Sequence, residues 1–299
     1  MRLNKLFAAG IAVLLSSSFF SATNAADTLK VAHYDQPAQM GMPYGTFGAN
    51  GAYQLYAIFD GLTFVDDDKK VYPRLATEWK LKDPNTWVVK LRKGVTFHNG
   101  VPWNADAMLG NVDAINNDPV VSKQQARRQL ATIVSGKKID DYTVELTTKV
   151  PDPVLPKRLH IMRPHEPKAW ADLGSKGYAR NPVGTGSYKI VNWGNDGLKM
   201  TAYENAWRKP KTKNVEITII PEIATRVQAL NSGQIHIAWA LDTGSMPIVE
   251  AGGNKVVVSR RHDTLNLILH HRKEDSPVKD VRVRRALNYA YDKETFVKE

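Results

Sequence analysis

The chain has 299 residues, with 41 lysines and arginines against 30 aspartates and glutamates, and its formal net charge is +11. It contains no cysteine, which excludes disulfide bonds, and it is long enough for two domains with cores of their own. The basic residues are scattered and lack the interleaved aromatic side chains on which nucleic-acid bases stack, so we expect no nucleic acid as a partner.

The first 25 residues are predicted to be a cleavable secretory signal peptide. Arg2 and Lys5 precede an apolar run over 6–15, and small residues at 22–25 complete the pattern. The run is shorter than the roughly 20 residues of a membrane-spanning helix, and it is apolar all round, unlike an amphipathic surface helix. Because no cysteine can carry a lipid, we expect a periplasmic protein, not lipid-anchored, that touches the membrane only through a partner.

The chain after this leader is predicted to begin with a strand over 28–33, where apolar and polar residues alternate. This strand ends at Tyr34 and Asp35. Ligands of open α/β sheets gather beyond the carboxyl ends of strands, so both residues are candidates for a ligand-binding cleft. Tyr34 would supply a flat apolar wall, and Asp35 would supply a polar anchor.

A stretch rich in glycine, proline and methionine over 36–50 is predicted to be a loop, and its Tyr44 is a further candidate wall of the cleft. Residues 51–59 are apolar enough for a buried helix, with Gly61 as its C-terminal cap. Three aspartates at 66–68 lack the glycine and the terminal glutamate of a calcium loop. They are therefore predicted to form a solvated hairpin tip.

Residues 62–180 read as a separate region of short elements, in which Asn104 is the predicted N-cap of a helix. The prolines at 164 and 167 interrupt the last part of this region, which we therefore interpret as mixed. The predicted elements are strands over 86–92 and 142–148, a hairpin turn at 140–141, helices over 105–116 and 122–132, and a mixed segment over 155–173.

A tight turn and a hairpin follow. The residue before Pro182 is biased towards extended conformations, and Gly184 and Gly186 permit backbone angles that a side chain would forbid. Two runs of β-prone residues, 187–195 and 198–205, then flank Asn-Asp-Gly, which is a strong hairpin signal.

A crossover is predicted next, made of a strand over 215–220, a helix over 222–232 and a strand over 234–239. Two strands joined by one helix form a βαβ unit. Trp239 and Asp242 follow its last strand, and they are candidate ligand-binding residues for the same reason as Tyr34 and Asp35.

The remaining sequence predicts a strand over 265–269, a polar turn over 271–279 and a helix over 281–291 with Asp280 as its N-cap. The sequence shows no motif typical of catalysis, metal binding or phosphate binding. The eight histidines show no metal-ligand spacing, the glycines at 184 and 186 lack the Gly-Lys-Ser/Thr ending of a phosphate loop, and no nucleophile elbow is present. We therefore expect no metal site, no cofactor and no enzymatic activity.

Five stretches resemble, in their order, the motifs of the family 5 extracellular solute-binding proteins, which are receptors of ABC importers. They are PRLATEW over 73–79, LRKGVTFHNG over 91–100, NPVGTGSYKI over 181–190, IIPEIATRVQALNSGQIHI over 219–237 and VRVRRALNYAYDKE over 281–294.

This resemblance implies an α/β fold of the type II periplasmic-binding-protein class. Residues 26–61 and 181–264 would form the first lobe, and 62–180 would form a small inserted α+β subdomain. Residues 265–299 would open a second lobe that is largely missing, as in a fragment, a frameshifted gene or a short paralogue. A chain truncated in this way is expected to bind ligand weakly or not at all and to aggregate. The carboxylate that receives the α-amine of a peptide in this family has no counterpart before residue 299.

The function that the resemblance implies is the capture of a small solute, favouring di- and oligopeptides, by closure of two lobes, and delivery to a membrane permease. A monomer is expected. Sugars, opines, metal chelates and haem stay open as ligands, as does a periplasmic sensor or chaperone-like protein on the same scaffold. For Tyr34 and Trp239, packing in the core between the lobes is the alternative to ligand contact.

Overall fold

The structure is a computed structural model that describes residues 27–45, 49–258, 268–292 and 294–295. Its contacts divide the chain into two compact units, residues 1–257 and 258–299, which are described separately. The predicted signal peptide lies outside the described residues. Within the described ranges, no helix is both long and apolar enough to cross a membrane.

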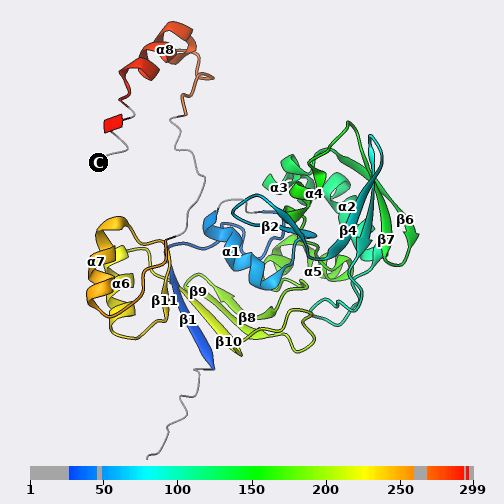
Figure 1. Cartoon of the computed structure of the whole chain (residues 1–299), viewed down its shortest axis with the longest axis horizontal. Coiled ribbons are helices and arrows are strands. Elements are labelled where there is room, and N and C mark those ends of the chain that lie inside the picture. The colour runs from blue at the N-terminus through cyan, green and yellow to red at the C-terminus, as the bar shows by residue number, and fades with distance from the viewer. Residues whose placement is uncertain (1–26, 46–48, 259–267, 293, 296–299) are drawn as a thin grey trace, which may run out of the picture. The chain divides into compact units, whose positions relative to one another are not determined.

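A five-stranded mixed sheet forms the centre of the first unit (Figure 1). Its order is β11-β1-β10-β9-β8, with β1 parallel to both of its neighbours and β9 antiparallel to β10 and β8. Strands on either side of the region 62–180 therefore lie in one sheet. The strands are β1 (Thr28–His33), β8 (Tyr188–Gly194), β9 (Gly197–Ala202), β10 (Asn214–Ile219) and β11 (Ile237–Ala238).

The predicted βαβ crossover is confirmed. α6 (Ile223–Asn231) joins β10 to β11, and β1 lies between these two strands. The last strand is shorter than the predicted range 234–239, because Gln234 and Ile235 donate their backbone N–H groups to the Ala229 carbonyl. These two residues complete the end of the helix and cannot pair with β1.

The predicted hairpin is also confirmed, with Gly197 at a φ of +139° in its turn. The explanation predicted for Gly184 and Gly186 is wrong, since neither has a positive φ. Both instead lie against the end of α1 (Ala49–Ile58), where an added Cβ would stand 2.2 Å from the Ile58 carbonyl oxygen at residue 184 and 2.4 Å from the Ala57 oxygen at residue 186. Close approach, not backbone angle, requires glycine here.

Residues 62–180 contain a four-stranded antiparallel sheet, in the order β4-β5-β7-β6, with α2 packed against β6, and a separate two-stranded sheet of β2 and β3. The predicted helix at 122–132 is replaced by a short 3-10 turn and a five-residue helix. The elements are β2 (Thr63–Val65), β3 (Val71–Pro73), β4 (Ala76–Asp83), β5 (Thr86–Leu91), α2 (Ala105–Asn117), α3 (Gln125–Gln129), β6 (Ile133–Asp140), β7 (Thr143–Thr148), α4 (Leu155–Arg158) and α5 (Pro167–Arg180).

Several local predictions hold in this region. Asn104 caps α2 by accepting a hydrogen bond from the Ala107 N–H at 3.0 Å. The three aspartates lie in the exposed turn between β2 and β3, where Asp66 accepts from the Lys70 N–H. The predicted cap at Gly61 is wrong, because α1 ends at Ile58.

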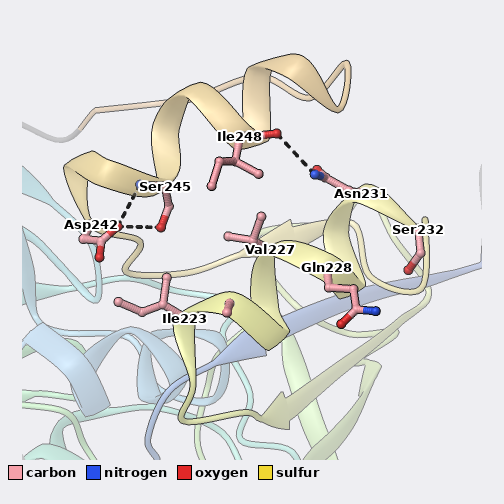
Figure 2. Close-up of a pocket in the computed structure, with 9 residues that line it drawn as sticks. Ile223, Val227, Gln228, Asn231, Ser232, Asp242, Ser245 and Ile248 are labelled. Atoms are coloured by element: carbon pink, nitrogen blue, oxygen red, sulfur yellow. Dashed lines mark hydrogen bonds between the residues drawn. The ribbon is translucent and has the colours of Figure 1, made fainter.

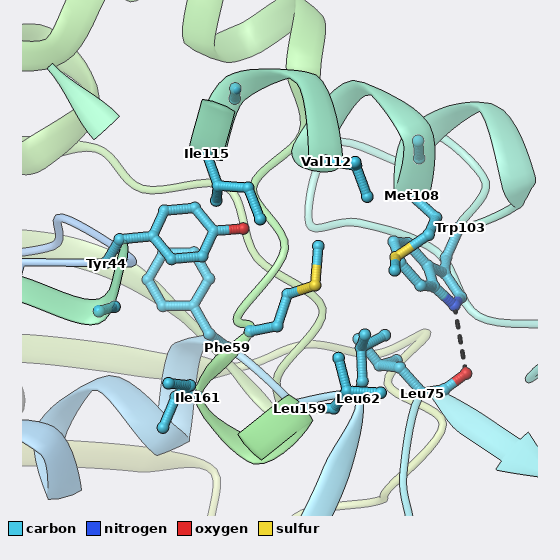
Figure 3. Close-up of a cluster of buried hydrophobic side chains, with 14 of the residues drawn as sticks. Tyr44, Phe59, Leu62, Leu75, Trp103, Met108, Val112, Ile115, Leu159 and Ile161 are labelled. Atoms are coloured by element: carbon cyan, nitrogen blue, oxygen red, sulfur yellow. Dashed lines mark hydrogen bonds between the residues drawn. The ribbon is translucent and has the colours of Figure 1, made fainter. Parts of the chain in front are cut away.

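One hydrophobic core continues from the N-terminal segment into the inserted region (Figure 3). Tyr44 and Phe59 lie on one side of it, and Met108 and Trp103 of the α2 segment lie on the other. All four side chains are at most 1% exposed, and the Trp103 indole donates to the Leu75 carbonyl. The predicted domain boundaries stay a prediction, since one shared core holds these segments together.

In the described part of the second unit, α8 (Val281–Ala290) has Asp280 as its N-cap, as predicted, with the carboxylate accepting from the Arg282 N–H at 2.8 Å. The predicted strand at 265–269 falls mostly outside the described residues. Its last two positions, Ile268 and Leu269, are described and are not in a strand.

Candidate functional site

Four aromatic rings gather at the carboxyl end of β1. The His33 ring stacks on Tyr34, with centroids 4.9 Å apart, and faces Trp239 at 6.1 Å. Tyr53, on the first turns of α1, lies 4.8 Å from Trp239. Trp239 reaches this place because its backbone N–H donates to the Ala32 carbonyl, which extends the parallel pairing of β11 with β1. We call His33, Tyr34, Tyr53 and Trp239 the aromatic cluster.

Two buried polar side chains in and beside the aromatic cluster have atoms without a hydrogen-bond partner within the described ranges. They are Nε2 of His33, a residue 3% exposed, and Oε1 of Gln54, also 3% exposed. The other end of each side chain is held by the loop after β1, since Nδ1 of His33 and Nε2 of Gln54 both contact the Asp35 carbonyl. Buried polar atoms are rarely left unpaired, so these two are suited to bind a polar group that enters the site.

Burial lowers the pKa of His33, and the Asp35 carbonyl, which favours the protonated ring, only partly opposes this shift. The ring is therefore neutral near pH 7. Because Nδ1 contacts a carbonyl oxygen, which can only accept, Nδ1 carries the proton of the neutral ring, and the unpaired Nε2 is left as an acceptor for a ligand N–H group or a metal ion.

Arg226 holds together the loops that follow β10 and β11. One guanidinium nitrogen donates to the Ile220 and Pro221 carbonyls at 2.6 and 2.7 Å, and another donates to the Ala240 carbonyl at 3.0 Å. The residue is 1% exposed, and its guanidinium lies 5.8 Å from the centroid of the Tyr34 ring. A single side chain thus fixes both loops beside the aromatic cluster.

Ala240, which accepts one of these bonds, has a φ of +54°. This left-handed conformation is uncommon for a residue with a Cβ and costs of order 1 kcal/mol or more. Such strain persists where surrounding contacts over-determine the backbone, as the Arg226 clamp does here. It turns the chain sharply just after Trp239.

The sequence-predicted site residues have different locations. Tyr34, Asp35 and Trp239 lie together at the carboxyl end of β1, as expected from the strand exits. Tyr44 is fully buried, and its hydroxyl donates to Asn111 at 2.8 Å, so it is a core residue with no surface to offer. Burial raises its pKa far above the usual value for tyrosine.

Asp242 is exposed and caps the 3-10 turn over 243–245, where it accepts from the N–H and the hydroxyl of Ser245 (Figure 2). These donors lower its pKa. It lies at one end of a mostly apolar groove of about 700 Å³ between α6 and α7 (Met246–Ala251), whose other lining residues include Val227 and Ile248. The structure therefore places Asp242 in this groove.

Sequence reasoning missed Tyr53, Gln54 and Arg226. A weak signal was present for two of them. Gln54 is a polar residue within an apolar helix, and Arg226 lies three positions after Ile223 on the stripe that faces the core. A polar or charged residue at such a position is expected to have a buried partner.

The described residues hold no group of three or more histidine, aspartate or glutamate side chains close enough to bind a metal ion. The arrangement is suited to binding. Flat rings can cover apolar parts of a small ligand, and a few fixed polar atoms can orient it.

The fold is that of an α/β protein with candidate ligand-binding residues at its strand ends, and the comparison with known families gives its class. Residues 70–299 match the family described as "Bacterial extracellular solute-binding proteins, family 5 Middle". The chain belongs to this family, which comprises solute-binding proteins of ABC importers.

Curated relatives include the glutathione-binding protein GsiB of Pectobacterium atrosepticum, which is 27% identical over 250 residues, covering 81% of this chain and 48% of that protein. GsiB of Salmonella typhimurium is 26% identical over 258 residues with the same coverage. The chain thus spans about half the length of the curated relatives it matches.

Among solved structures, NikZ of Campylobacter jejuni in complex with Ni(L-His) is 28% identical, with a TM-score of 0.80. The match covers 91% of this chain and 55% of NikZ. DppA of Helicobacter pylori, in complex with the peptide STSA, has a TM-score of 0.64 at 22% identity, covering 75% of this chain and 48% of DppA, which supports the fold alone. The first-lobe α/β fold inferred from the sequence is thereby confirmed.

Proposed function

We propose that the chain is the periplasmic solute-binding component of an ABC importer, that it captures a small solute at the aromatic cluster, and that it transforms nothing. The observation that carries this proposal is the pair of unpartnered buried atoms, His33 Nε2 and Gln54 Oε1, beside Tyr53 and Trp239 at a strand exit. Family membership gives the class of protein, and this geometry supports the proposed place of binding.

The ligand class that we propose first is short peptides. The relatives named GsiB are glutathione-binding proteins, and a peptide offers what the site lacks. Its amide N–H groups can donate to Gln54 Oε1 and His33 Nε2, while its apolar side chains can lie on the rings of Tyr53 and Trp239.

A second candidate is the chelate of a divalent metal with an amino acid. The likeness to NikZ, solved with Ni(L-His), favours it, and so does His33, whose neutral ring presents an unpartnered nitrogen. The metal would arrive with its own ligands, because the described residues supply no ligand cluster of their own.

Capture is proposed to work by lobe closure followed by docking on a permease. A ligand that touches two lobes binds the closed state more tightly than the open one, and this difference in affinity drives closure. Moving a population from 1:99 to 99:1 requires about 5.5 kcal/mol of differential binding. The aromatic cluster would supply the contacts from the first lobe.

Titration calorimetry tests the proposal with di-, tri- and tetrapeptides, glutathione and the nickel complex of L-histidine. We expect heat of binding for one of these classes and a loss of at least about tenfold in affinity for Trp239→Ala, since an aromatic contact contributes over 1 kcal/mol. Tyr72→Ala is the control, because it removes an exposed aromatic side chain on the β2–β3 hairpin, outside the aromatic cluster.

Two results would contradict the proposal. One is an equal loss of affinity in Trp239→Ala and Tyr72→Ala, which would place the ligand elsewhere. The other is turnover of the peptides during the titration, seen as new species by mass spectrometry, which would make the chain an enzyme.

A further inference from the structure

Two arginines contact one buried carboxylate where α1 ends, and a third arginine lies beside them. Asp60 is 2% exposed, and its Oδ1 accepts from Nε and Nη2 of Arg208 at 3.0 and 2.6 Å. Nη1 of Arg74 lies 3.8 Å from the same oxygen. Arg92 joins the group by donating from Nε to the Arg74 carbonyl at 2.7 Å. We call Arg74, Arg92 and Arg208 the arginine cluster.

The positive charge of the arginine cluster is not balanced. Asp60 is the one carboxylate within ion-pair distance of Arg74 and Arg208 in the part of the chain that the structure describes, and Arg92 makes no ion pair there. Three guanidinium groups against one carboxylate leave two positive charges. Burial first, and then the charge of Arg208, lowers the pKa of Arg74, although arginine stays protonated.

Trp207 gives the cluster a rigid support. Its indole N–H donates to Oδ2 of Asp60 at 2.8 Å, so the ring is fixed. The guanidinium carbons of Arg92 and Arg208 lie 4.3 and 5.4 Å from its ring centroid. Cation–π contact and the support of Asp60 hold the side chains close together despite their repulsion. Both Nη groups of Arg92 have no hydrogen-bond partner in the described ranges and are free to bind.

The arginine cluster and the aromatic cluster lie toward opposite edges of the sheet. Trp207 and Arg208 follow β9, which runs antiparallel to β10, and the end of β9 pairs with the start of β10. β10 runs parallel to β1, so Arg208, beside the start of β8, lies toward the edge of the sheet at which β1 begins, whereas the aromatic cluster is at the carboxyl end of β1. The two sites cannot share one small ligand.

We propose that the arginine cluster is a binding site for a small dianion of the phosphate class, either free phosphate or a phosphate monoester. A dianion neutralises the two surplus charges. Guanidinium groups match phosphate oxygens with paired N–H donors, and Arg74 and Arg92 have such donors to spare. The side chains of Arg74 and Arg208 are 26% and 34% exposed, which leaves a half-buried entrance where charge-assisted bonds are less screened than on an open surface.

The test is calorimetry and thermal unfolding of the full chain at pH 8 with phosphate, glycerol phosphate and a hexa-aspartate peptide, at ionic strength matched with sodium chloride. Comparing free phosphate with glycerol phosphate shows whether the site prefers the free ion or a phosphate monoester. We expect saturable binding of at least one of them, a rise in the unfolding temperature, and at least about tenfold weaker binding in Arg74→Gln.

Arg128→Gln is the matched control, because it removes the same charge from an exposed position that has no ion pair among the described residues, and it should bind like the parent. Arg74→Lys keeps the charge but loses the paired N–H donors of the guanidinium group, so it should bind phosphate with intermediate affinity. If neither phosphate nor the monoester shows saturable binding at concentrations up to about 10 mM, the proposal is overturned. Equal effects of both glutamine variants, or binding of hexa-aspartate alone, would overturn it as well.

Discussion

Asn111 shows how buried polar residues join the loops of the first unit to its core. Its Oδ1 accepts from the Tyr44 hydroxyl at 2.8 Å and from the His165 N–H at 3.0 Å. Its Nδ2 donates to the carbonyls of Ala107 and His165, both at 2.9 Å. All four of its hydrogen-bonding positions are used, so a residue at 0% exposure carries no unpaired group. This network fixes Tyr44 in the core.

His165, which this network places, makes stability depend on pH. It is 1% exposed among aromatic rings, and burial lowers its pKa to about 4 from an ordinary 6.5. The unfolded chain therefore binds the proton first as pH falls. The contribution of the neutral ring is complete above pH 6.5 and is lost between pH 6.5 and 4, by up to about 3 kcal/mol.

We predict that His165→Phe flattens this acid-induced loss of stability, measured by urea unfolding at pH 7 and pH 4.5. Burial also lowers the pKa of His98 to about 4, so His98 should still make the free energy of unfolding fall with pH in this variant. His271→Gln is the control, since His271 is exposed, and its pH profile should match the parent. If the free energy of unfolding of His165→Phe falls with pH as steeply as that of the parent, His165 takes up its proton as readily in the folded chain as in the unfolded chain, which contradicts the prediction.

Residues near strand exits were predictable, but their partners were not. Tyr34, Asp35 and Trp239 followed from the rule that ligands gather at carboxyl ends of strands. Arg226 and Asp60 act through groups distant in sequence. Arg226 reaches Ala240, and Asp60 reaches Arg208 across 148 positions, a pairing that no local pattern contains. The location of Tyr44 in a Gly- and Pro-rich loop suggested exposure, whereas its contacts bury it.

At the scale of elements, local signals decided which predictions were confirmed. The β8–β9 hairpin depends on its own turn residues, and the crossover depends on one helix between two apolar runs. The sequence predicts only a mixed segment over 155–173, because Pro164 and Pro167 both interrupt its pattern. Pro167 is instead the first residue of α5, where its missing N–H costs nothing, and Glu166 caps the helix by accepting from two N–H groups.

The capped start of α2 gives a prediction at this scale. Asn104→Ala removes the acceptor for the Ala107 N–H, so we expect a loss of about 1 kcal/mol in the free energy of unfolding, measured by urea titration. Asn104→Asp keeps an acceptor at this position and should retain most of the stability. Equal losses in the two variants would contradict a capping role for Asn104.

For the whole molecule, the described structure separates two sites by their place on one sheet. The aromatic cluster lies at the carboxyl end of β1, and Arg208 of the arginine cluster lies toward the opposite edge of the sheet. Parallel pairing of β1 with both neighbours brings three strand exits to the first site, as in other open α/β sheets that bind ligands. The family and the fold class were readable from motifs spread along the chain, whereas the solute was not, because the residues of the aromatic cluster lie outside those motifs.

The most direct test of the central claim is photo-crosslinking with a short peptide that carries a benzophenone side chain, followed by mapping of the crosslinked residues by mass spectrometry. The claim is that solute binds at the carboxyl end of β1, and crosslinks are then expected at Tyr34, Tyr53 or Trp239, with competition by the unlabelled peptide. Competed crosslinks confined to the groove between α6 and α7 around Val227 and Ile248, or none at the aromatic cluster with any peptide or amino-acid chelate probe, would contradict it.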